Sequence, residues 1–153
     1  MAVVIKSPHP FNDVSGVSVF LAGTIDDGSG VDWQELVGSE LNDFEIIILN
    51  PRRSEWNSSW VQSIDNLFFK AQVEWELAAL EAATYIYIYF APGSYSPISL
   101  LELGLHAASG KIIAVCPDGF WKKGNVDIVG EKFGFPVFQD MATGLTYLKA
   151  KLV

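Results

Sequence analysis

One stretch near the middle of the chain constrains the fold most: a strand-like run that breaks and gives way to a helix. Residues 84–90 alternate Tyr with Ile, which is typical of a strand buried in a sheet. Residues 91–95 contain Pro and Gly and end that strand. Ser96 and Pro97 then fit the N-cap and first position of a helix that Gly110 ends. In open α/β sheets, ligands bind where such a helix begins, at the carboxyl end of a strand.

Strand-like and helical segments alternate in the same way along the whole chain. The expected strands are residues 16–23, 44–49, 84–90, 111–116 and 136–138, and the lead over residues 1–15 is irregular apart from at most a short strand at 3–6. The expected helices are residues 32–41, 62–83, 96–110, 129–133 and 142–152. This alternation predicts an α/β fold: a single domain over residues 1–153, with a doubly wound, parallel five-stranded sheet of the flavodoxin or Rossmann type.

Composition excludes several classes of protein. A formal net charge of −8, with no run of Lys or Arg, argues against a nucleic-acid polymer as partner. The longest apolar runs are of strand length, so we expect neither a membrane span nor a signal peptide. The single cysteine, Cys116, is best explained as a buried small hydrophobe, and a reduced, cytoplasmic setting is the simplest expectation. His9 and His106 lack partners at ligand spacing, so no metal ion or other cofactor is expected.

Glu102 lies in the predicted helix beside the expected ligand crevice, and two interpretations of it stay open. Ser99 and Glu102 fit the S-x-x-E capping box, in which the glutamate only bonds back to the N-cap N–H. If the helix instead begins at Ser96 and Pro97, Glu102 lies beyond capping reach. A role in a functional site is then the better interpretation.

A second glutamate stands out in the helix expected over residues 62–83. The apolar residues on one face of that helix are Phe69, Val73, Leu80 and Ala83. Glu76 falls on the same face, where a carboxylate is costly unless a partner binds it. Glu76 is therefore either a site residue, brought to the same sheet edge as Ser96, or a solvated group at the margin of the apolar stripe.

Three loops add polar candidates. Gly23 and Thr24 follow the strand over 16–23 and fit either a phosphate- or sugar-binding loop or an ordinary strand-to-helix connection. Arg52 and Arg53 follow the strand over 44–49 and either bind an anionic group or pair with surface carboxylates. Asn125 lies in an expected loop over residues 117–126 that also carries two aromatic residues.

Four motifs lie at these strand ends and helix starts: FLAGTI at 20–25, NPRR at 50–53, QVEWE at 72–76 and SPISLLELG at 96–104, the last followed by GK at 110–111. Together they resemble the nucleoside 2-deoxyribosyltransferase family. The similarity runs from about residue 17 to residue 138 and extends to the 2-deoxynucleoside 5-phosphate N-hydrolases of the same superfamily. It is most specific around Glu102, in an S/D-x-x-x-x-x-E-x-G pattern.

The resemblance implies roles for individual residues. Glu102 matches the family's catalytic glutamate, which attacks the anomeric carbon of deoxyribose, and Glu76 matches the acidic residue that hydrogen-bonds or protonates the departing base. Ser96 matches a position that meets the sugar hydroxyls, and Gly23 and Thr24 match the loop that lines the sugar or its 5-substituent. The remaining substrate-binding candidates are Asp26, Arg52, Ser99 and Asn125.

Cleavage of an N-glycosidic bond passes through an oxocarbenium-like state and uses two carboxyls in unlike states. We expect Glu102, near free helix N–H groups, to stay ionised, and the partly buried Glu76 to have a raised pKa and donate a proton. The implied activity is cleavage or transfer of the N-glycosidic bond of 2-deoxyribonucleosides through a glycosyl-enzyme on Glu102. The sequence does not choose between hydrolysis and transfer.

Two differences from the family pattern keep a second hypothesis open. Asp26 stands where the monophosphate hydrolases have a basic residue, and its charge favours a nucleoside over a nucleotide. Phe20 and Leu21 stand where the family has an early tyrosine. The alternative is a non-catalytic sensor or regulatory module that binds a nucleoside or nucleotide with the same fold.

The aromatic content bears on assembly. The chain has five Trp and ten Phe, with aromatic loops at Trp56, Trp60 and residues 120–121. Members of the family are homo-oligomers, and an oligomer interface would bury these side chains. We therefore expect a dimer or a higher closed form, with the loop around Asn125 reaching a neighbour's site. Otherwise the aromatic residues line the base pocket of a monomer.

Overall fold

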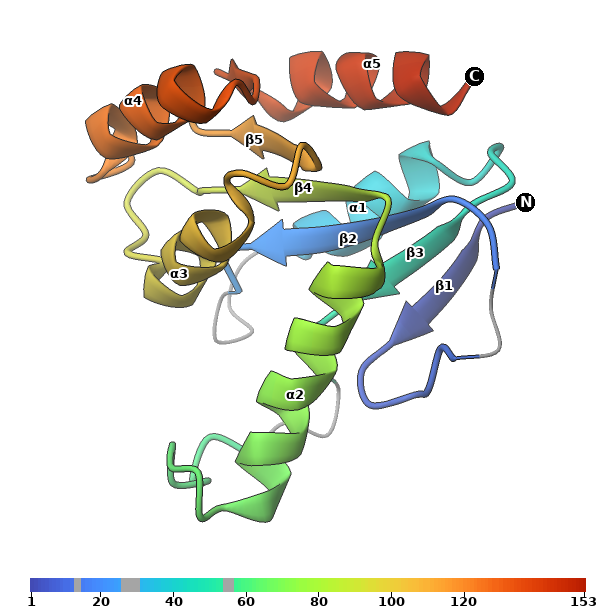
Figure 1. Cartoon of the computed structure of the whole chain (residues 1–153), viewed down its shortest axis with the longest axis vertical. Coiled ribbons are helices and arrows are strands. Elements are labelled where there is room, and N and C mark those ends of the chain that lie inside the picture. The colour runs from blue at the N-terminus through green and yellow to red at the C-terminus, as the bar shows by residue number, and fades with distance from the viewer. Residues whose placement is uncertain (13–14, 26–30, 54–56) are drawn as a thin grey trace.

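The computed structural model describes residues 1–12, 15–25, 31–53 and 57–153. In this part of the chain, strands alternate with helices almost throughout (Figure 1). The strands are β1 (Val3–Lys6), β2 (Ser18–Gly23), β3 (Ile47–Asn50), β4 (Tyr85–Tyr89), β5 (Ile112–Val115) and β6 (Val137–Phe138). The helices are α1 (Trp33–Glu40), α2 (Leu67–Ala82), α3 (Pro97–His106), α4 (Lys123–Phe133) and α5 (Met141–Leu152). None of these described helices is long and apolar enough to cross a membrane.

All strands join one parallel sheet in the order β1-β3-β2-β4-β5-β6. This confirms the predicted α/β fold, with six strands in place of five. The additional strand is β1, which pairs with β3 at the sheet edge. Its side chains gave a weak signal because Val3 and Val4 are about half exposed, so backbone pairing holds this strand more than burial does.

The order of the strands reverses at β2. The chain passes from β2 to β3 on one side and then crosses to β4 on the other side. The carboxyl ends of β2 and β4 therefore form a topological switch point, the usual ligand crevice of doubly wound sheets. In the register of this pair, Gly23 lies opposite Tyr89, so the segments that leave both strands begin side by side.

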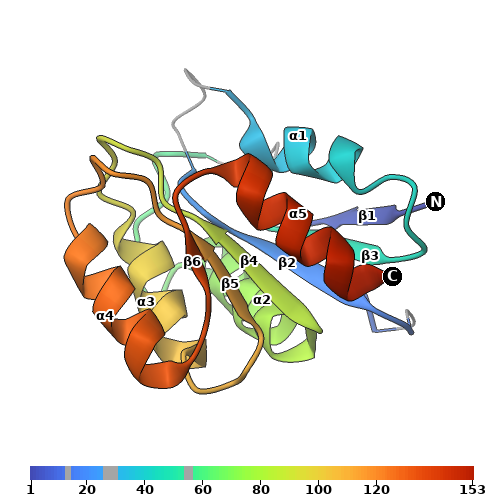
Figure 2. The same cartoon turned by 90° about the horizontal axis from the view of Figure 1, so that it is seen from above.

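Helices cover both faces of the sheet (Figure 2). Neighbouring residues of β2 point to opposite faces, as the two-residue period of a strand requires. Phe20 packs with Trp75 of α2 and Leu103 of α3, whereas Leu21 packs with Trp33 of α1 and, further along that face, the buried residues of α5. Helices α2, α3 and α4 thus share one face, and α1 and α5 share the other.

Two helix boundaries differ from the sequence-based expectation. Helix α2 begins at Leu67 rather than at residue 62, because the Asn66 side chain accepts hydrogen bonds from the backbone N–H groups of Phe68 and Phe69 and caps the helix there. Helix α4 spans Lys123–Phe133 rather than 129–133. Its glycines at 124 and 130 lower the intrinsic helix propensity and obscured its first turns.

Candidate active site

Gly23 and Thr24 join the carboxyl ends of β2 and β4 tightly. Gly23 has a φ of 141°, and a Cβ on it would collide with the carbonyl oxygen of Tyr89 and lie 2.9 Å from the Trp33 ring. Only glycine fits this close approach. The Thr24 N–H donates to Tyr89 O at 2.9 Å, and the Trp33 indole donates to Thr24 O at 2.7 Å. The start of the loop is thereby fixed to β4 and to α1.

The Thr24 hydroxyl is the centre of a cluster of three hydroxyls. Thr24 Oγ1 lies 2.7 Å from Ser96 Oγ and 3.1 Å from Ser94 Oγ, and it accepts the Ala91 N–H at 2.9 Å. Ser94 Oγ and Ser96 Oγ lie 3.0 Å apart. The cluster therefore ties the loop after β4 to the end of β2, across the switch point.

Ser96 has an unusual backbone conformation at the start of α3. Its φ of 45° and ψ of 53° place it in the left-handed region, and its side chain makes no cap hydrogen bond to the helix. Such a conformation in a residue other than glycine costs about 1–3 kcal/mol and concentrates at functional sites. The hydrogen bonds of its hydroxyl to Thr24 and Ser94 hold it there.

The boundary of α3 settles the local role of Glu102. The helix begins at Pro97 after Ser96, as one of the two interpretations predicts, so Ser99 is not an N-cap and Glu102 is not part of a capping box. Ser99, Glu102 and Leu103 are the buried residues of α3, and Glu102 is only 7% exposed. The carboxyl therefore faces the interior rather than the solvent.

The expectation that Glu102 stays ionised is contradicted by its burial. Burial raises the pKa of Glu102 to about 8, and the negative charge of Glu76 raises it further in the same direction. The N–H groups that were expected to favour the anion belong to the first turn of α3, whereas Glu102 lies in the second turn, where the effect of a helix terminus has faded.

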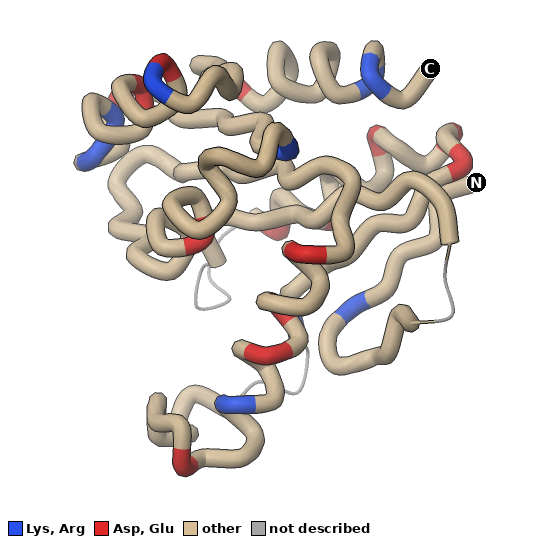
Figure 3. The backbone as a smooth tube through the Cα atoms, viewed as in Figure 1, with Lys and Arg blue, Asp and Glu red and all other residues tan. Residues whose placement is uncertain are grey.

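Glu76 is half-buried on α2. Burial raises its pKa to about 7, and a hydrogen bond from Gln72 acts in the opposite direction. The buried face of α2 is centred on Gln72, Trp75 and Ala79 rather than on Val73, so Glu76 lies at the margin of that face. Figure 3 shows the acidic residues along α2 and on α3, the two helices on the same face of the sheet.

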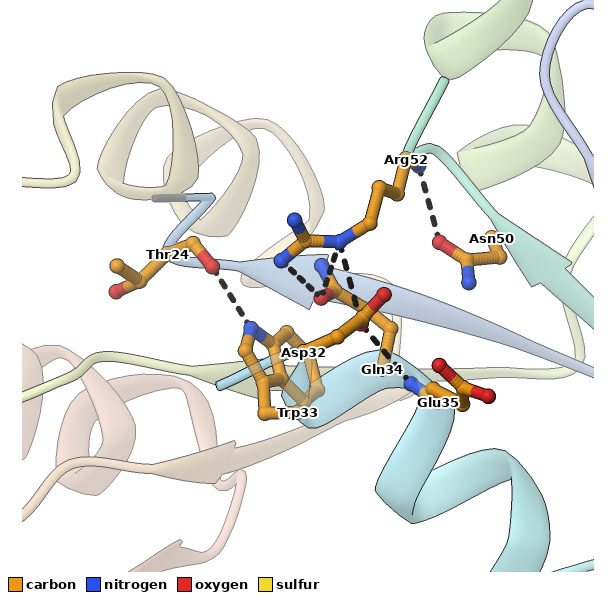
Figure 4. Close-up of polar contacts among 7 residues, drawn as sticks. All are labelled: Thr24, Asp32, Trp33, Gln34, Glu35, Asn50 and Arg52. Atoms are coloured by element: carbon orange, nitrogen blue, oxygen red, sulfur yellow. Dashed lines mark hydrogen bonds and ion pairs between the residues drawn. The ribbon is translucent and has the colours of Figure 1, made fainter. Parts of the chain in front are cut away.

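Arg52 lies at the end of β3 and is held by α1 (Figure 4). Its Nε is 3.2 Å from Asp32 Oδ1, and its Nε and Nη2 donate to Gln34 Oε1 at 3.3 and 3.0 Å. Asp32 also caps α1 by accepting from the Glu35 N–H at 3.1 Å. Of the two interpretations from the sequence, the structure shows pairing with a carboxylate. A role for Arg52 in substrate binding stays a prediction.

A family model described as nucleoside 2-deoxyribosyltransferase like matches residues 16–120. The match covers more than half of the chain and runs from β2 through β5, so it contains Thr24, Glu76, Ser96 and Glu102. The chain belongs to this nucleoside 2-deoxyribosyltransferase-like family. No curated protein sequence matched it significantly.

The predicted site residues fall into three groups according to where the structure and the family match place them. Six of them lie at the end of β2, at the start of α3 or on helices α2 and α3, which share one face of the sheet: Gly23, Thr24, Glu76, Ser96, Ser99 and Glu102. Asn125 is exposed in the first turn of α4, because the loop predicted around it is helical, and it lies beyond the matched residues. Asp26 and Trp56 lie outside the described residues.

Three polar residues of this family member escaped the sequence analysis. Ser94 is a turn residue with no distinguishing pattern, and Gln34 follows the N-cap of α1. Gln72 had a recognisable signal, since it lies four residues before Glu76 and therefore next to it on a helix.

Few of the described residues are candidates for binding a metal ion or for acting as a reactive thiol. They contain no group of three or more His, Cys, Asp or Glu side chains that could hold a metal ion. Cys116 is fully buried, and burial raises the pKa of its thiol to about 11, which confirms its interpretation as a small hydrophobe.

Proposed function

We propose that the protein cleaves or transfers the N-glycosidic bond of 2-deoxyribonucleosides, with Glu102 as the nucleophile. One observation carries this proposal: two carboxyls of raised pKa, Glu76 on α2 and Glu102 on α3, interact electrostatically, and Glu102 lies on the helix that begins at the hydroxyl cluster. Retaining cleavage of a glycosidic bond needs such a pair, one member to attack and one to move a proton. Membership of the deoxyribosyltransferase-like family supports deoxyribonucleosides as the substrate class.

The reactive state is the pair with one proton. The reaction requires this proton on Glu76, although the higher pKa of Glu102 favours that carboxyl as its site. The Glu102 carboxylate attacks the anomeric carbon, so that a Glu102–sugar ester forms as the bond between sugar and base breaks. The base leaves with the bonding electrons and accepts the proton of Glu76. Water or a second base then attacks the anomeric carbon, gives its proton to Glu76 and releases Glu102 as a carboxylate. Water gives hydrolysis, and a base gives transfer.

The surrounding residues support an uncharged sugar more than a phosphate. Thr24, Ser96 and Ser99 offer hydroxyls that both donate and accept, as sugar hydroxyls require. The charge of Arg52 is matched by Asp32, and Asp26 adds a negative charge to the loop after β2. We therefore propose a nucleoside rather than a nucleotide as substrate. The lone buried Cys116 fits a reducing, cytoplasmic setting.

Chromatography of free base tests this function. The protein is incubated with purine and pyrimidine deoxyribonucleosides, with and without an acceptor base. We expect release of base by the wild type and a loss of at least about 100-fold in Glu102→Gln, since removing a nucleophile removes the covalent route. Glu74→Gln is the matched control, because Glu74 lies on α2 but pairs with Lys70 at the surface. Base exchange without net hydrolysis identifies a transferase.

One observation favours a second candidate, a non-catalytic sensor or regulatory module that binds nucleosides or nucleotides. Burial raises the pKa of Glu102 to about 8, which favours the protonated carboxyl at neutral pH, and a protonated carboxyl is a poor nucleophile. The sensor hypothesis predicts that nucleosides raise the Tm in proportion to RT ln(1 + [L]/Kd) while no base is released. Turnover that Glu102→Gln abolishes excludes it.

A further inference from the structure

The side-chain amide of Gln72 is held at both ends by partners outside α2. Ser7 Oγ donates to Gln72 Oε1 at 2.6 Å, and Gln72 Nε2 donates to the carbonyl oxygen of Pro51 at 3.1 Å. Both Ser7 and Gln72 are buried, with 3% and 6% of their surface exposed. Because the Pro51 oxygen can only accept, the amide nitrogen must face it, and the amide oxygen then faces Ser7. The two partners together exclude the flipped amide.

The orientation of this amide determines what Gln72 offers to Glu76. The amide nitrogen carries two hydrogens, and one of them is used by Pro51. Glu76 lies one helical turn after Gln72, within reach of the second hydrogen. Burial raises the pKa of Glu76, and the amide of Gln72 acts on it in the opposite direction. An amide N–H bound to a carboxyl lowers its pKa because it stabilises the ionised form.

The segment that carries Ser7 packs along α2 next to this contact. The Trp75 indole donates to His9 O at 2.8 Å, and the Phe11 ring meets the Trp75 ring edge-on with centroids 5.6 Å apart. The Ser7 N–H donates to Asn50 O at 3.1 Å, which continues the pairing of β1 with β3. Ser7 therefore has little freedom to move away from Gln72. All of this segment precedes residue 16, where the family match begins.

We propose that Ser7 and Gln72 are positioning residues for Glu76: Ser7 holds the Gln72 amide so that its nitrogen donates to the Glu76 carboxyl. The role of Glu76 as the acid rests on the proposed function, whereas the contact itself does not. In the reaction, Gln72 stabilises Glu76 after it has given up its proton, and it keeps the pKa of this acid close to neutral pH, where a general acid works best.

The charged groups around Glu76 determine how this inference is tested. Glu102 faces it from α3 and titrates together with it. On α2 itself, Glu74 is exposed and paired with Lys70. On the side of β1, Lys6 and His9 are exposed. The test is therefore made in a Glu102→Gln background, in which the strongest coupling to Glu76 is absent.

The measurement is the titration of the Glu76 carboxyl by carbon-13 NMR of glutamate-labelled protein, with the signal assigned by its loss in Glu76→Gln. We expect Gln72→Met to move the midpoint upward by about one pH unit or more, as the loss of a hydrogen bond to a charged group predicts. Ser7→Ala shifts it less and in the same direction, because the amide then loses one of its two anchors. Ser7→Thr keeps a hydroxyl and restores the midpoint.

Ser18→Ala is the matched control. Ser18 is also a buried serine with a hydrogen-bonded hydroxyl, but it pairs with Thr84 at the amino end of β2, at the opposite edge of the sheet. The variant Ser18→Ala should lower the Tm and leave the midpoint of the Glu76 titration unchanged. An unchanged midpoint in both Gln72→Met and Ser7→Ala overturns the inference, as does an equal shift in Ser18→Ala. If Gln72→Met does not fold, the inference is tested by comparing the Glu76 midpoints of Ser7→Ala and Ser7→Thr.

The titration separates this inference from the proposed function, because it uses no substrate. If the protein releases no base but the midpoints shift, the proposed function is rejected and the contact between Gln72 and Glu76 is supported. If the protein releases base but no midpoint shifts, the proposed function is supported and the positioning role of Ser7 and Gln72 is rejected.

Discussion

The charge of Glu76 on α2 raises the pKa of Glu102 on α3, a carboxyl whose pKa burial has already raised. The two side chains come from separate helices on one face of the sheet, and their charges interact. Carboxyls that interact in this way lose their protons in two steps that belong to the pair. The pair therefore passes through a state with one proton between about pH 7 and pH 8. The proposed reaction needs that proton on Glu76, whereas the pKa order of the two carboxyls favours Glu102.

The first prediction concerns the pH dependence of turnover. At low pH both carboxyls are protonated and no nucleophile is present, whereas at high pH both are ionised and no acid is present. We expect kcat/KM to follow a bell-shaped curve with its maximum between the apparent pKa values of the pair, about 7 and about 8. A single rise with a midpoint near the ordinary carboxyl value of 4.5 contradicts the shared proton.

The second prediction concerns stability. Because the folded protein raises the pKa of Glu102 above its unfolded value of 4.5, the fold binds more protons than the unfolded chain between that value and about 8. The contribution of Glu102 to stability is therefore greatest at low pH and declines as the pH rises through this window. Glu102→Gln carries no charge and should have a higher Tm than the wild type at pH 8, with a smaller gain at pH 5.

Thermal unfolding at the two pH values checks this gain, with about 2–4 °C expected for each kcal/mol in a protein of this size. The exposed pair on α2 supplies the control: Glu74→Gln should not gain stability at pH 8. A Tm difference between Glu102→Gln and the wild type that is independent of pH contradicts burial of an ionisable Glu102.

The third prediction concerns the hydroxyl cluster. Thr24→Val keeps the shape of the side chain but leaves the Ala91 N–H without its partner and the Ser96 hydroxyl with Ser94 alone. We expect the free energy of unfolding to fall by about 1–3 kcal/mol and KM for the nucleoside to rise, because the start of α3 is no longer tied to β2. Thr24→Ser retains the hydroxyl and should preserve both. A loss in Thr24→Ser as large as that in Thr24→Val would contradict the role of the hydroxyl.

The fourth prediction concerns assembly. Ile98, Leu101 and Leu105 recur on α3 at helical spacing, each is more than half exposed, and Tyr95 lies exposed just before the helix. A second copy of the chain can cover this stripe with the same stripe about a two-fold axis, so we expect a dimer or a higher closed form. Size exclusion with light scattering measures the mass. Leu101→Lys should yield monomers, and a wild-type mass of one chain at micromolar concentration contradicts the oligomer.

The sequence was sufficient to predict those elements whose structure is determined by the chemistry of neighbouring residues. The apolar runs of β2, β4 and β5 are buried on both faces, so composition alone identified them. Ser96 and Pro97 marked the start of α3 because Pro fits the first position of a helix and few others. The candidate site followed from these two predictions, since carboxyl ends of parallel strands lie at one edge of the sheet.

The sequence was insufficient to predict those features that depend on contacts between distant parts of the chain. The half-exposed residues of β1 carry no clear pattern, and the strand exists because β3 offers a backbone edge. The two glycines of α4 obscured its first turns, and with them the helical position of Asn125. The state of Glu102 depends on burial and on a charge from another helix, neither of which its place in α3 reveals.

Mass spectrometry of the protein during turnover tests the central claim, that Glu102 forms a covalent bond to the sugar. The protein is mixed with a deoxyribonucleoside, quenched in acid within one turnover and digested. The account predicts a peptide containing Glu102 that is heavier by one 2-deoxyribosyl group, absent from Glu102→Gln and lost again when an acceptor base is added. Release of base by Glu102→Gln at the wild-type rate, with no adduct on the wild type, would contradict it.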